Sequence, residues 1–495
     1  MKKIFVFCFL FLAGCQLVSA SSLYRIRFAS YPEKIRAVFD FNGAFTYEVK
    51  EASQEKIILR LKDCNATTDI PNYVEANDLV VRYFEIQKEG NDLLVSIPLG
   101  EPIGYKFLYL SDPPRLVIDF GKDFIKIASG GMIDDGIEFL KVKKGSAQGM
   151  LLANVLRIDP HKTEIAPALA RKQKPNLFES FINFIFPWKK EETPRHFFLD
   201  KVSNMVQDNG AVAGINGTFF ASNGKPLGAL MIHREMVSFS IHDRTALFLD
   251  EANQPYIDNL YISSYARVPN GVSLPINGMN EGRGENETIL YSPAWGERTE
   301  TNQSGVELVF SKSILKQINL SNSTIPEDGY VISIHGPLKE QINDLIKVGE
   351  KIDLHIKVVP FSAAPKSIIH LISGGPRLIK NGGVYVTKYG EKFRADVANR
   401  RAARTAVGIN QQQQLLLVTL DGAQRKNGNK TNDEVSIGAT LEELADLMLS
   451  LDAVDAMNLD GGSSTTMVVK DTVVSRSQSG SQRRVSNALL VRPKI

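Results

Sequence analysis

The sequence predicts a two-part molecule of the α+β or mixed α/β class, in which a small β-sandwich precedes a larger mixed-sheet domain. Three observations lead to this prediction. The chain has 495 residues, too many for one ordinary domain. Short apolar runs bounded by polar turns dominate residues 22–125. Further along, similar runs are interspersed with segments of helical character.

The composition is that of a folded protein with room for a large core, since 43% of the residues are hydrophobic and 23% are charged. The net charge of +3 gives no support for nucleic-acid binding. The three cysteines are Cys8, Cys15 and Cys64. Because the first two fall in an N-terminal leader, neither an internal disulfide nor a thiolate metal cage is expected.

Residues 1–20 have the pattern of an export leader, in which two lysines precede an apolar run at 4–13 that is too short to span a bilayer. Two processing sites compete. Residues 12–15, LAGC, resemble a bacterial lipobox, in which Cys15 would be lipidated. Residues 18–20, VSA, resemble a signal-peptidase site. We favour the lipobox because all four residues and their spacing fit. The protein is therefore expected in the bacterial cell envelope, periplasmic or anchored to the membrane as a lipoprotein.

The first domain is expected over residues 22–125. Its strand candidates are residues 56–61, 92–97, 105–110 and 115–120, with a strand–turn–strand pattern at 35–49. The segment YKFLYLSDPPRLVIDF, residues 105–120, resembles the AMIN domain, a small β-sandwich of bacterial envelope proteins. The resemblance implies attachment to peptidoglycan. A plain spacer between the anchor and the second domain is the alternative.

The second domain is expected over residues 130–495, after a linker at 121–136. A helix is expected at 197–208, before the Asn209–Gly210 stop. A second helix is expected at 440–451, where Thr440 and Glu443 form a capping box. Residues 269–300 form a long polar loop of the kind that carries function. Residues 175–190 have helical spacing and predict either a helix packed on the domain or an interfacial helix on a membrane.

Strand-like runs recur through this domain. They cover residues 150–156, 211–215, 246–249, 306–310, 330–334 and 354–359.

Four glycine-rich and polar turns in this domain are each attached to an apolar strand. They are GINGTFF at 214–220, SGGPRLI at 373–379, RTAVGIN at 404–410 and MNLDGGSS at 457–464. Glycine lets the backbone bend sharply and expose successive N–H groups, which bind anions. Arg377 and Arg404 offer planar donors suited to a phosphate. The carboxylates of Asp421 and Asp460 stand where apolar runs meet glycine. Singly, each turn is more often an ordinary bend; their combination predicts a site.

The same turns carry a resemblance to the phosphodiester glycosidase family. The matching segments are Asn-Gly-x-Phe-Phe at 216–220, Gly-Gly-Pro-x-Leu at 374–378, Arg-Thr-Ala at 404–406, Leu-Asp-Gly at 420–422 and Asn-Leu-Asp-Gly-Gly-Ser at 458–463. The resemblance implies cleavage of a sugar C1–O–phosphate bond without a cofactor. Ser463 stands where the family often has a third glycine, which affects the fine geometry of the loop.

The resemblance also implies roles for individual residues. The catalytic set is Asp460, acting at the sugar carbon as nucleophile or base, Asp421 as second carboxylate, and Arg404 as phosphate ligand with the amides of Gly461 and Gly462 and the Ser463 hydroxyl. Asn216 and Asn458 would orient sugar hydroxyls. The full substrate-binding set comprises Asn216, Gly217, Gly374, Gly375, Thr405, Asn458, Gly461, Gly462, Ser463 and Ser464.

Two rival functions stay open. A non-catalytic glycan-binding protein would use the same turns to hold a polymer. A metal-assisted phosphodiesterase would bind a hard cation through Asp421, Asp460 and Asn458. His233, His242, His335 and His370 lack paired ligand spacing and are interpreted as packed or surface residues. No loop of EF-hand spacing supports a calcium ion. The expected partner is a glycan or sugar-phosphate polymer.

Overall fold

The computed structural model describes residues 21–494 except 32, 77, 79, 172–195, 363–366, 424–434, 478 and 480. The leader, Cys15 and the segment 175–190 lie outside the described residues. By internal contacts the chain divides into two compact units. The first ends at Lys126 and also takes in Gly145–Gly149, and the second comprises Ile127–Lys144 and the chain from Met150 onward. The sequence-based domain boundaries stay predictions.

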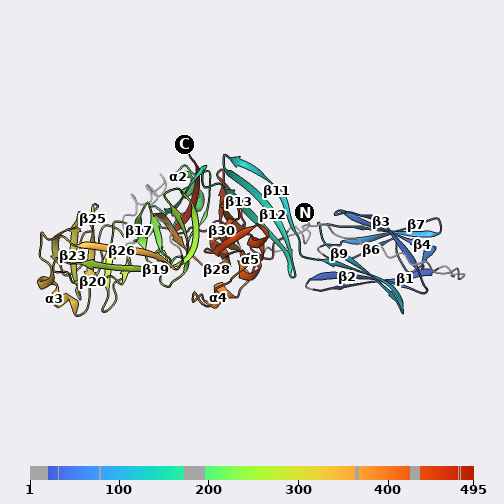
Figure 1. Cartoon of the computed structure of the whole chain (residues 1–495), viewed down its shortest axis with the longest axis horizontal. Coiled ribbons are helices and arrows are strands. Elements are labelled where there is room, and N and C mark those ends of the chain that lie inside the picture. Colours follow the sequence, from blue (N-terminus) through green and yellow to red (C-terminus); the bar gives the residue numbers. More distant parts are fainter. Residues whose placement is uncertain are drawn as a thin grey trace, which may run out of the picture. The chain divides into compact units, whose positions relative to one another are not determined.

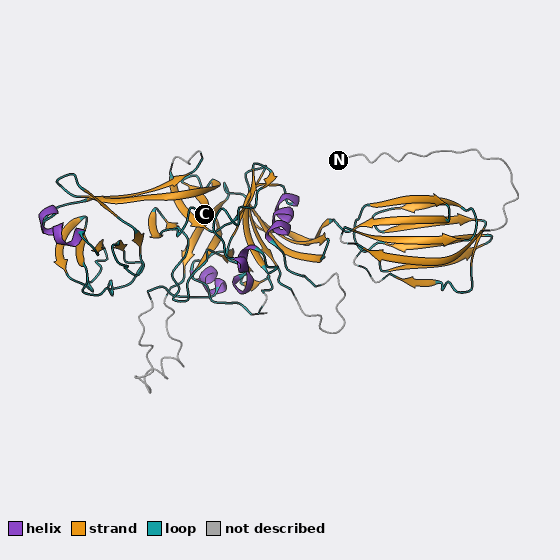
Figure 2. Cartoon of the chain, turned by 90° about the horizontal axis from the view of Figure 1, so that it is seen from below, coloured by secondary structure: helices purple, strands orange, loops and turns teal. Residues whose placement is uncertain are grey.

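The predicted fold class is wrong, because the described residues are mostly β (Figure 2). Four α-helices occur among them: α2 (Val202–Asp208), α3 (Leu338–Leu345), α4 (Ala395–Ala398) and α5 (Leu441–Ser450). The sheets are built largely from antiparallel neighbours, which short turns can join, so crossover helices are not needed. The helix predicted at 197–208 begins only at Val202, since Asp200 pairs with Val485 as an isolated β-bridge.

The first unit consists of two five-stranded sheets (Figure 1). Phe84 of one sheet contacts Phe28, Phe39 and Phe120 of the other, so the apolar faces pack together. In order, the first sheet contains β5 (Cys64–Ala66), β1 (Ser21–Ser30), β2 (Lys34–Phe41), β10 (Pro114–Gly121) and β9 (Tyr105–Ser111). The second contains β3 (Thr46–Ala52), β4 (Lys56–Lys62), β8 (Asp92–Pro98), β7 (Tyr83–Glu89) and β6 (Tyr73–Glu75).

The second unit is centred on an eight-stranded sheet. Its order is β11 (Ile125–Asp134), β12 (Ile137–Ser146), β13 (Gly149–Ile158), β31 (Leu415–Leu420), β30 (Arg404–Asn410), β32 (Ala453–Asn458), β28 (Arg377–Lys380) and β29 (Gly383–Val384). The linker predicted at 121–136 is therefore largely strand β11. Most of its side chains are exposed, so it lacks the apolar alternation by which a strand is recognised.

A five-stranded sheet of the same unit carries the Asn216 turn. Its order is β14 (Thr163–Leu169), β35 (Asn487–Pro493), β15 (Ala213–Asn216), β33 (Met467–Val469) and β34 (Thr472–Val473). The edge strand β14 is protected from further pairing. The side chain of Asn253 bonds the amide of Ile165 and the carbonyl of Thr163, and Pro167 has no N–H to offer.

Two more sheets complete the second unit. The seven-stranded one has the order β17 (Glu235–Ser238), β16 (Leu230–Ile232), β27 (Ile368–Ser373), β18 (Thr245–Asp250), β19 (Pro255–Arg267) and β20 (Ser273–Pro275), with β26 (Asp353–Pro360) also on β19. The other has the order β21 (Gly278–Met279), β22 (Thr288–Tyr291), β25 (Gly329–Ile334), β23 (Val306–Ser311) and β24 (Ile314–Asn319). The loop predicted at 269–300 thus contains three short strands.

Helix α5 packs against the central sheet and supports the strands that carry the candidate site. Its capping box is confirmed: the Thr440 hydroxyl accepts the Glu443 amide, and the Glu443 carboxylate accepts the Thr440 amide. Leu441, Leu444 and Leu447 are buried against β28, β30 and β32. None of the helices in the described part of the chain is long and apolar enough to cross a membrane.

Replacing the cap tests how firmly α5 supports the sheet. Thr440→Ala removes the acceptor for one helix N–H and is expected to lower the free energy of unfolding by about 1 kcal/mol. Ser450→Ala is the matched control, because its exposed hydroxyl only bonds the Asp446 carbonyl one turn earlier. Urea titration of both variants measures the effect. Equal stabilities for the two variants would contradict the role of the cap.

Candidate active site

Three of the predicted residues, Arg404, Asp421 and Asp460, lie at one end of the central strands of the eight-stranded sheet. Strand β31 ends at Leu420, opposite Arg404 at the start of β30. Strand β32 ends at Asn458, opposite Ala406 of β30. Since these strands are antiparallel, the ends of β31 and β32 lie beside the start of β30. Asp421 directly follows β31, and Asp460 lies two residues after the end of β32. Both bends therefore lie at the same end of the sheet as Arg404.

Asn216 joins three of the bends through its side-chain amide. Its Nδ2 donates to the Asp460 carbonyl at 2.6 Å. Its Oδ1 accepts from the Thr405 hydroxyl at 2.8 Å and from the Thr466 amide at 3.0 Å. Only 1% of Asn216 is exposed. The structure thus brings together the predicted residues Asn216, Thr405 and Asp460, and it engages both polar atoms of the Asn216 side chain with protein groups.

Asp460 lies at the centre of this arrangement. Its amide donates to the Gly217 carbonyl at 3.2 Å, and its Oδ1 accepts from the Gly461 amide at 3.0 Å. Burial raises the pKa of Asp460 to about 6, although its hydrogen bond with Ser464 and the charge of Arg483 lower it. A carboxyl group with this pKa exchanges its proton near neutral pH, which suits an acid or base in catalysis.

The loop after Asp460 is shaped by its glycines. A Cβ on Gly461 would come within 2.9 Å of the Ala403 carbonyl oxygen, and Gly462 has φ +62°. Gly462–Ser464 form one turn of 3₁₀-helix. The Gly462 amide donates to the Ala403 carbonyl at 2.8 Å. The two amides predicted to bind phosphate are therefore both bonded within the protein.

Arg483 was not found from the sequence, because it stands in a polar segment without a motif. Its Nη1 lies 3.3 Å from the Ser463 hydroxyl and 3.1 Å from the Ser464 hydroxyl, and it donates to both. Its guanidinium carbon lies 4.9 Å from the centre of the Phe220 ring. This exposed cation therefore stands beside Asp460 and its loop.

Arg404 is buried, and its guanidinium bonds backbone carbonyls. Nε donates to Ala439 at 3.0 Å, Nη1 donates to Val397 at 3.1 Å, and Nη2 donates to Arg400. Burial lowers the pKa of Arg404 to about 10, so the group stays cationic at neutral pH. In the structure it fixes the segment that leads into β30.

Asp421 belongs to a different hydrogen-bond set from Asp460. Its Oδ1 accepts from the Asn154 side chain at 3.3 Å and from the Arg476 amide at 2.9 Å. Burial raises its pKa to about 6 as well. Within the described residues, no hydrogen bond joins Asp421 to Asp460 or to Asn216.

Gly374 and Gly375 connect the seven-stranded sheet to the end of β32. The Gly374 amide donates to the Thr245 carbonyl at 2.9 Å, and the Gly375 amide donates to the Asn458 carbonyl at 2.7 Å. The Asn458 side chain returns a bond from Nδ2 to the Gly375 carbonyl at 2.9 Å. Gly375 has φ +96°, and a Cβ there would clash with the Glu391 carboxylate. Both glycines are therefore needed for this close approach.

Unpartnered polar atoms gather beside these bends. Buried polar atoms in folded proteins almost always have a partner, so such atoms point to a missing ligand or water. A Cβ on Gly228 would clash with both the Thr218 and the Ser373 hydroxyl, so these two groups flank it. The buried side-chain atoms without a partner here are Thr218 Oγ1, Ser373 Oγ, Asn487 Nδ2, Asn458 Oδ1 and Arg244 Nε. Only Asn458 was singled out from the sequence.

Other charged candidates have structural partners. Arg377, whose planar donors suit a phosphate, is paired with Asp258 and Asp455 in the interior. The part of the chain that the structure describes contains no cluster of three or more His, Cys, Asp or Glu side chains placed to hold a metal ion.

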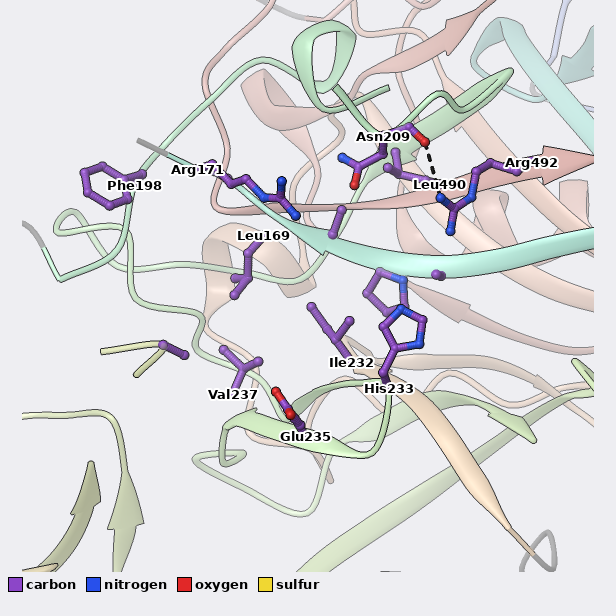
Figure 3. Close-up of a pocket in the computed structure, with 15 residues that line it drawn as sticks. Leu169, Arg171, Phe198, Asn209, Ile232, His233, Glu235, Val237, Leu490 and Arg492 are labelled. Atoms are coloured by element: carbon purple, nitrogen blue, oxygen red, sulfur yellow. Dashed lines mark hydrogen bonds between the residues drawn. The ribbon is translucent and has the colours of Figure 1, made fainter. Parts of the chain in front are cut away.

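A cavity of about 630 Å³ lies around the edge strand β14, away from the predicted residues (Figure 3). Figure 3 shows Ile232, His233 and Val237 on one side of the cavity and Asn209 and Arg492 on the other. No residue of the predicted site lines it. The candidate site therefore rests on hydrogen bonds and unpartnered polar atoms at the strand ends, not on this cavity.

The fold and the site define a β-rich protein whose second unit carries two carboxyl groups of raised pKa and several polar turns at the ends of central strands. Residues 299–492 match the family model described as phosphodiester glycosidase. Over this stretch the chain is similar to the phosphodiester glycosidase family. The match includes the Asp421 and Asp460 bends, while Asn216 and Arg244 lie before it.

Curated relatives show the same similarity. N-acetylglucosamine-1-phosphodiester alpha-N-acetylglucosaminidase of Bos taurus is 35% identical over 117 residues, covering 22% of this chain and 20% of the relative. The Mus musculus protein of that name is 27% identical over 161 residues, covering 30% of this chain and 29% of the relative. The chain thus spans less than a third of the length of these relatives.

Solved structures share the fold. A hypothetical protein from Synechocystis superposes with a TM-score of 0.60 at 22% identity, covering 96% of this chain and 81% of that protein. A Burkholderia pseudomallei K96243 protein superposes with a TM-score of 0.54 at 17% identity, covering 91% of this chain and 97% of that protein. At these identities the likeness concerns the fold alone.

The raised pKa of Asp421 predicts a stability effect. The carboxyl group of Asp421 binds its proton more tightly in the folded protein than in the unfolded chain. The free energy of unfolding therefore falls as pH rises from the unfolded pKa, near 4, through the folded pKa, about 6. Asp421→Asn keeps Oδ1 as an acceptor and removes the charge. At pH 8 it is expected to raise the free energy of unfolding by up to about 3 kcal/mol, and at pH 4 by much less.

Urea titrations at the two pH values measure this effect. Asp471→Asn, at an exposed turn position, is the control and should change little at either pH. A destabilised Asp421→Asn protein at pH 8 would show that the carboxylate is held by favourable interactions and that burial does not dominate its pKa.

Proposed function

We propose that this protein hydrolyses the C1–O–phosphate bond of a sugar phosphodiester, with Asp460 acting at the sugar carbon. The observation that carries the proposal is the placement of Asp460, a partly buried residue whose carboxyl pKa is raised by burial to about 6, on the Asn-Leu-Asp-Gly-Gly-Ser bend within the segment that matches the phosphodiester glycosidase model. The named activity of the curated relatives, cleavage of an N-acetylglucosamine-1-phosphodiester, supports the same chemistry.

The reaction needs little general acid catalysis, because a phosphate is a good leaving group even when it is not fully protonated. The C1–O bond breaks with its electron pair going to the phosphate oxygen. A water oxygen forms the new bond to C1, and its proton passes to a carboxylate. Asp460 serves either as the base for this water or as a nucleophile that water later displaces. Both routes place the water oxygen on the sugar and release a phosphate monoester.

The surroundings of Asp460 suit this reaction. Asn216 fixes the backbone carbonyl of Asp460, so the bend cannot drift as substrate binds. Arg483, held by Ser463 and Ser464, supplies positive charge at the exposed side of the loop, where a phosphate would enter. Arg404 holds the start of β30 by its three carbonyl contacts, and in this proposal its charge acts on the phosphate without leaving them.

Asp460→Asn tests the central step. The substitution removes the base or nucleophile and should lower kcat/KM for a nitrophenyl sugar-1-phosphodiester by about 10²- to 10⁴-fold. Asp452→Asn, at an exposed turn eight residues earlier, should retain full activity. Steady-state rates of the two folded variants decide the matter. Undiminished turnover by Asp460→Asn would remove Asp460 from the mechanism.

The pH dependence gives an independent test. Because Asp460 works as a carboxylate, kcat/KM should fall below pH 6 and level off above it. The Ser464 hydrogen bond lowers the pKa of Asp460, so Ser464→Ala should move the midpoint to higher pH. Ser450→Ala, which removes an exposed hydroxyl on α5, should leave the midpoint in place. A midpoint that is unchanged or lower in Ser464→Ala would contradict the assignment.

Isotopically labelled water separates the rival functions. Label in the released sugar identifies attack at C1, whereas label in the phosphate identifies attack at phosphorus and favours the phosphodiesterase alternative. Binding of a glycan without turnover favours the non-catalytic alternative.

We also propose that the substrate is an envelope or extracellular glycan, and that the first unit holds the protein near it. The edge strands β3 and β9 present a row of aromatic rings, in which Tyr47 lies 6.0 Å from Phe107 and Phe45 lies 5.0 Å from Tyr109. Nearly half of Tyr109 is exposed. Phe45 is buried and Tyr47 and Phe107 are partly buried, so Tyr109 is the ring of this group that can contact the apolar face of a sugar. Export, lipidation of Cys15 and peptidoglycan attachment are part of this proposal and rest on the sequence patterns.

A further inference from the structure

We propose that Arg244, held against the rings of Phe219 and Phe393, binds the phosphate group of the substrate. This inference rests on the proposed function and deepens it, because Arg244 lies outside the matched family segment and was not found by any sequence motif. It assigns the ligand as a phosphate ester carrying at least one negative charge.

The first observation is a buried cation without a counter-ion. Only 8% of Arg244 is exposed, and its Nε has no hydrogen-bond partner. Within the described residues, no ion pair or side-chain hydrogen bond of Arg244 is found. Burying an unpaired charge is costly, so proteins normally pair such a group or use it for a ligand.

The second observation is the geometry of the guanidinium. Its central carbon lies 4.1 Å from the centre of the Phe393 ring and 6.0 Å from that of Phe219. The two rings are themselves 5.6 Å apart. Stacking covers the face of a guanidinium and leaves its N–H groups, which lie in the plane, able to donate. A tetrahedral anion with several acceptor oxygens matches such an edge.

The acid nearest to this arginine is already bonded elsewhere. The Glu391 carboxylate accepts from the amide and hydroxyl of Thr245 at 2.9 and 2.6 Å and from the Arg377 amide at 3.0 Å. It also accepts from the Thr387 hydroxyl. Glu391 raises the pKa of Arg244 through its charge, while burial lowers it. Glu391 thus orders the segment that carries Phe393 and leaves the Arg244 donors unpaired.

The backbone places Arg244 next to the candidate site. Arg244 immediately precedes β18, whose first residue, Thr245, accepts the Gly374 amide. Gly375, which follows Gly374, donates its amide to the Asn458 carbonyl. A Cβ on Gly375 would lie 3.0 Å from the Phe393 ring. Asn458 is two residues from Asp460, and its Oδ1 is unpartnered. Gly374 and Gly375 therefore bring the aromatic platform, the rings of Phe219 and Phe393 against Arg244, close to the bend that carries Asp460.

Two cations, Arg244 and Lys392, act at this position beside the acids Asp243 and Glu391. The pKa of His242 is lowered by burial and by the charges of Arg244 and Lys392, while Asp243 raises it. Lys392 is exposed and neighbours Phe393. A phosphate bound here would contact the buried arginine, with the exposed lysine near it. In this arrangement Arg244 binds the phosphate, and Asp460 acts on the attached sugar.

The test measures phosphate binding and catalysis separately in the full chain. Inorganic phosphate is titrated by calorimetry at constant ionic strength into wild type, Arg244→Gln and Arg244→Lys. We expect Arg244→Gln to weaken phosphate binding at least tenfold and to raise KM for the nitrophenyl sugar phosphodiester at least tenfold. Arg244→Lys keeps the charge without the planar donors and should fall between. The control is Arg394→Gln, beside Phe393, whose side chain is 90% exposed; it should stay within twofold of wild type.

Thermal unfolding distinguishes a ligand site from a structural role. Phosphate should raise Tm of wild type and not of Arg244→Gln. In phosphate-free buffer Arg244→Gln should melt no lower than wild type, because it removes an unpaired buried charge. Should that variant fail to fold, Phe393→Leu, which removes the platform and keeps the charge, should show the same loss of phosphate affinity.

The outcomes separate this inference from the proposed function. Phosphate binding lost in Arg244→Gln, in a protein that hydrolyses no sugar phosphodiester, supports the anion site and overturns the proposed function. Normal phosphate affinity and normal KM in Arg244→Gln, with active wild type, overturn the inference and leave the proposed function standing. No phosphate binding by wild type also overturns it.

Discussion

The candidate site depends on one buried amide. Asn216 bonds Thr405, 189 residues further along the chain, and Thr466, 250 residues further along, as well as the backbone of Asp460. Because the amide is buried, losing it would leave the Asp460 carbonyl and the Thr466 amide without this partner, each at a cost of about 1–3 kcal/mol, whereas the Thr405 hydroxyl would keep its contact with Thr465 at 3.4 Å. The close placement of Asp460 and the strand start at Thr405 therefore follows from a single side chain that contacts both.

The two buried arginines near the site show how the same residue type can serve different purposes. Arg404 belongs to a recognisable motif, yet its donors are taken up by backbone carbonyls that shape the entry to β30. Arg244 belongs to no motif, and its charge is buried without a partner beside Phe393. A motif identifies a position that the fold requires, whereas an unsatisfied donor identifies a position that awaits something else.

The sequence predicted local features well and non-local ones poorly. The capping box of α5 is a pattern of four neighbouring residues, so it could be read directly. Strand β4 shows clear alternation and was also expected, whereas β11 is mostly exposed and was mistaken for a linker. The fold class was wrong because strand direction is decided by pairing between distant segments. Arg244 was missed for the same reason: its environment comes from residues 219, 391 and 393.

Burial raises the pKa of both Asp421 and Asp460 to about 6, so their pKa values do not distinguish their roles. The bonds to Asp421 come from Asn154 and the Arg476 backbone, and an asparagine could accept both. Asp460 instead lies among Ser464, Arg483 and the Asn216-held bend, where proton loss is coupled to a hydroxyl and a cation that a substrate can reach. Of the two carboxyl groups, Asp460 is the one that lies beside a hydroxyl and an exposed cation, Ser464 and Arg483. Its charge is therefore better placed to act on a substrate than that of Asp421. In the proposed mechanism Asp421 remains a second carboxylate, held by Asn154 and the Arg476 backbone at the end of β31.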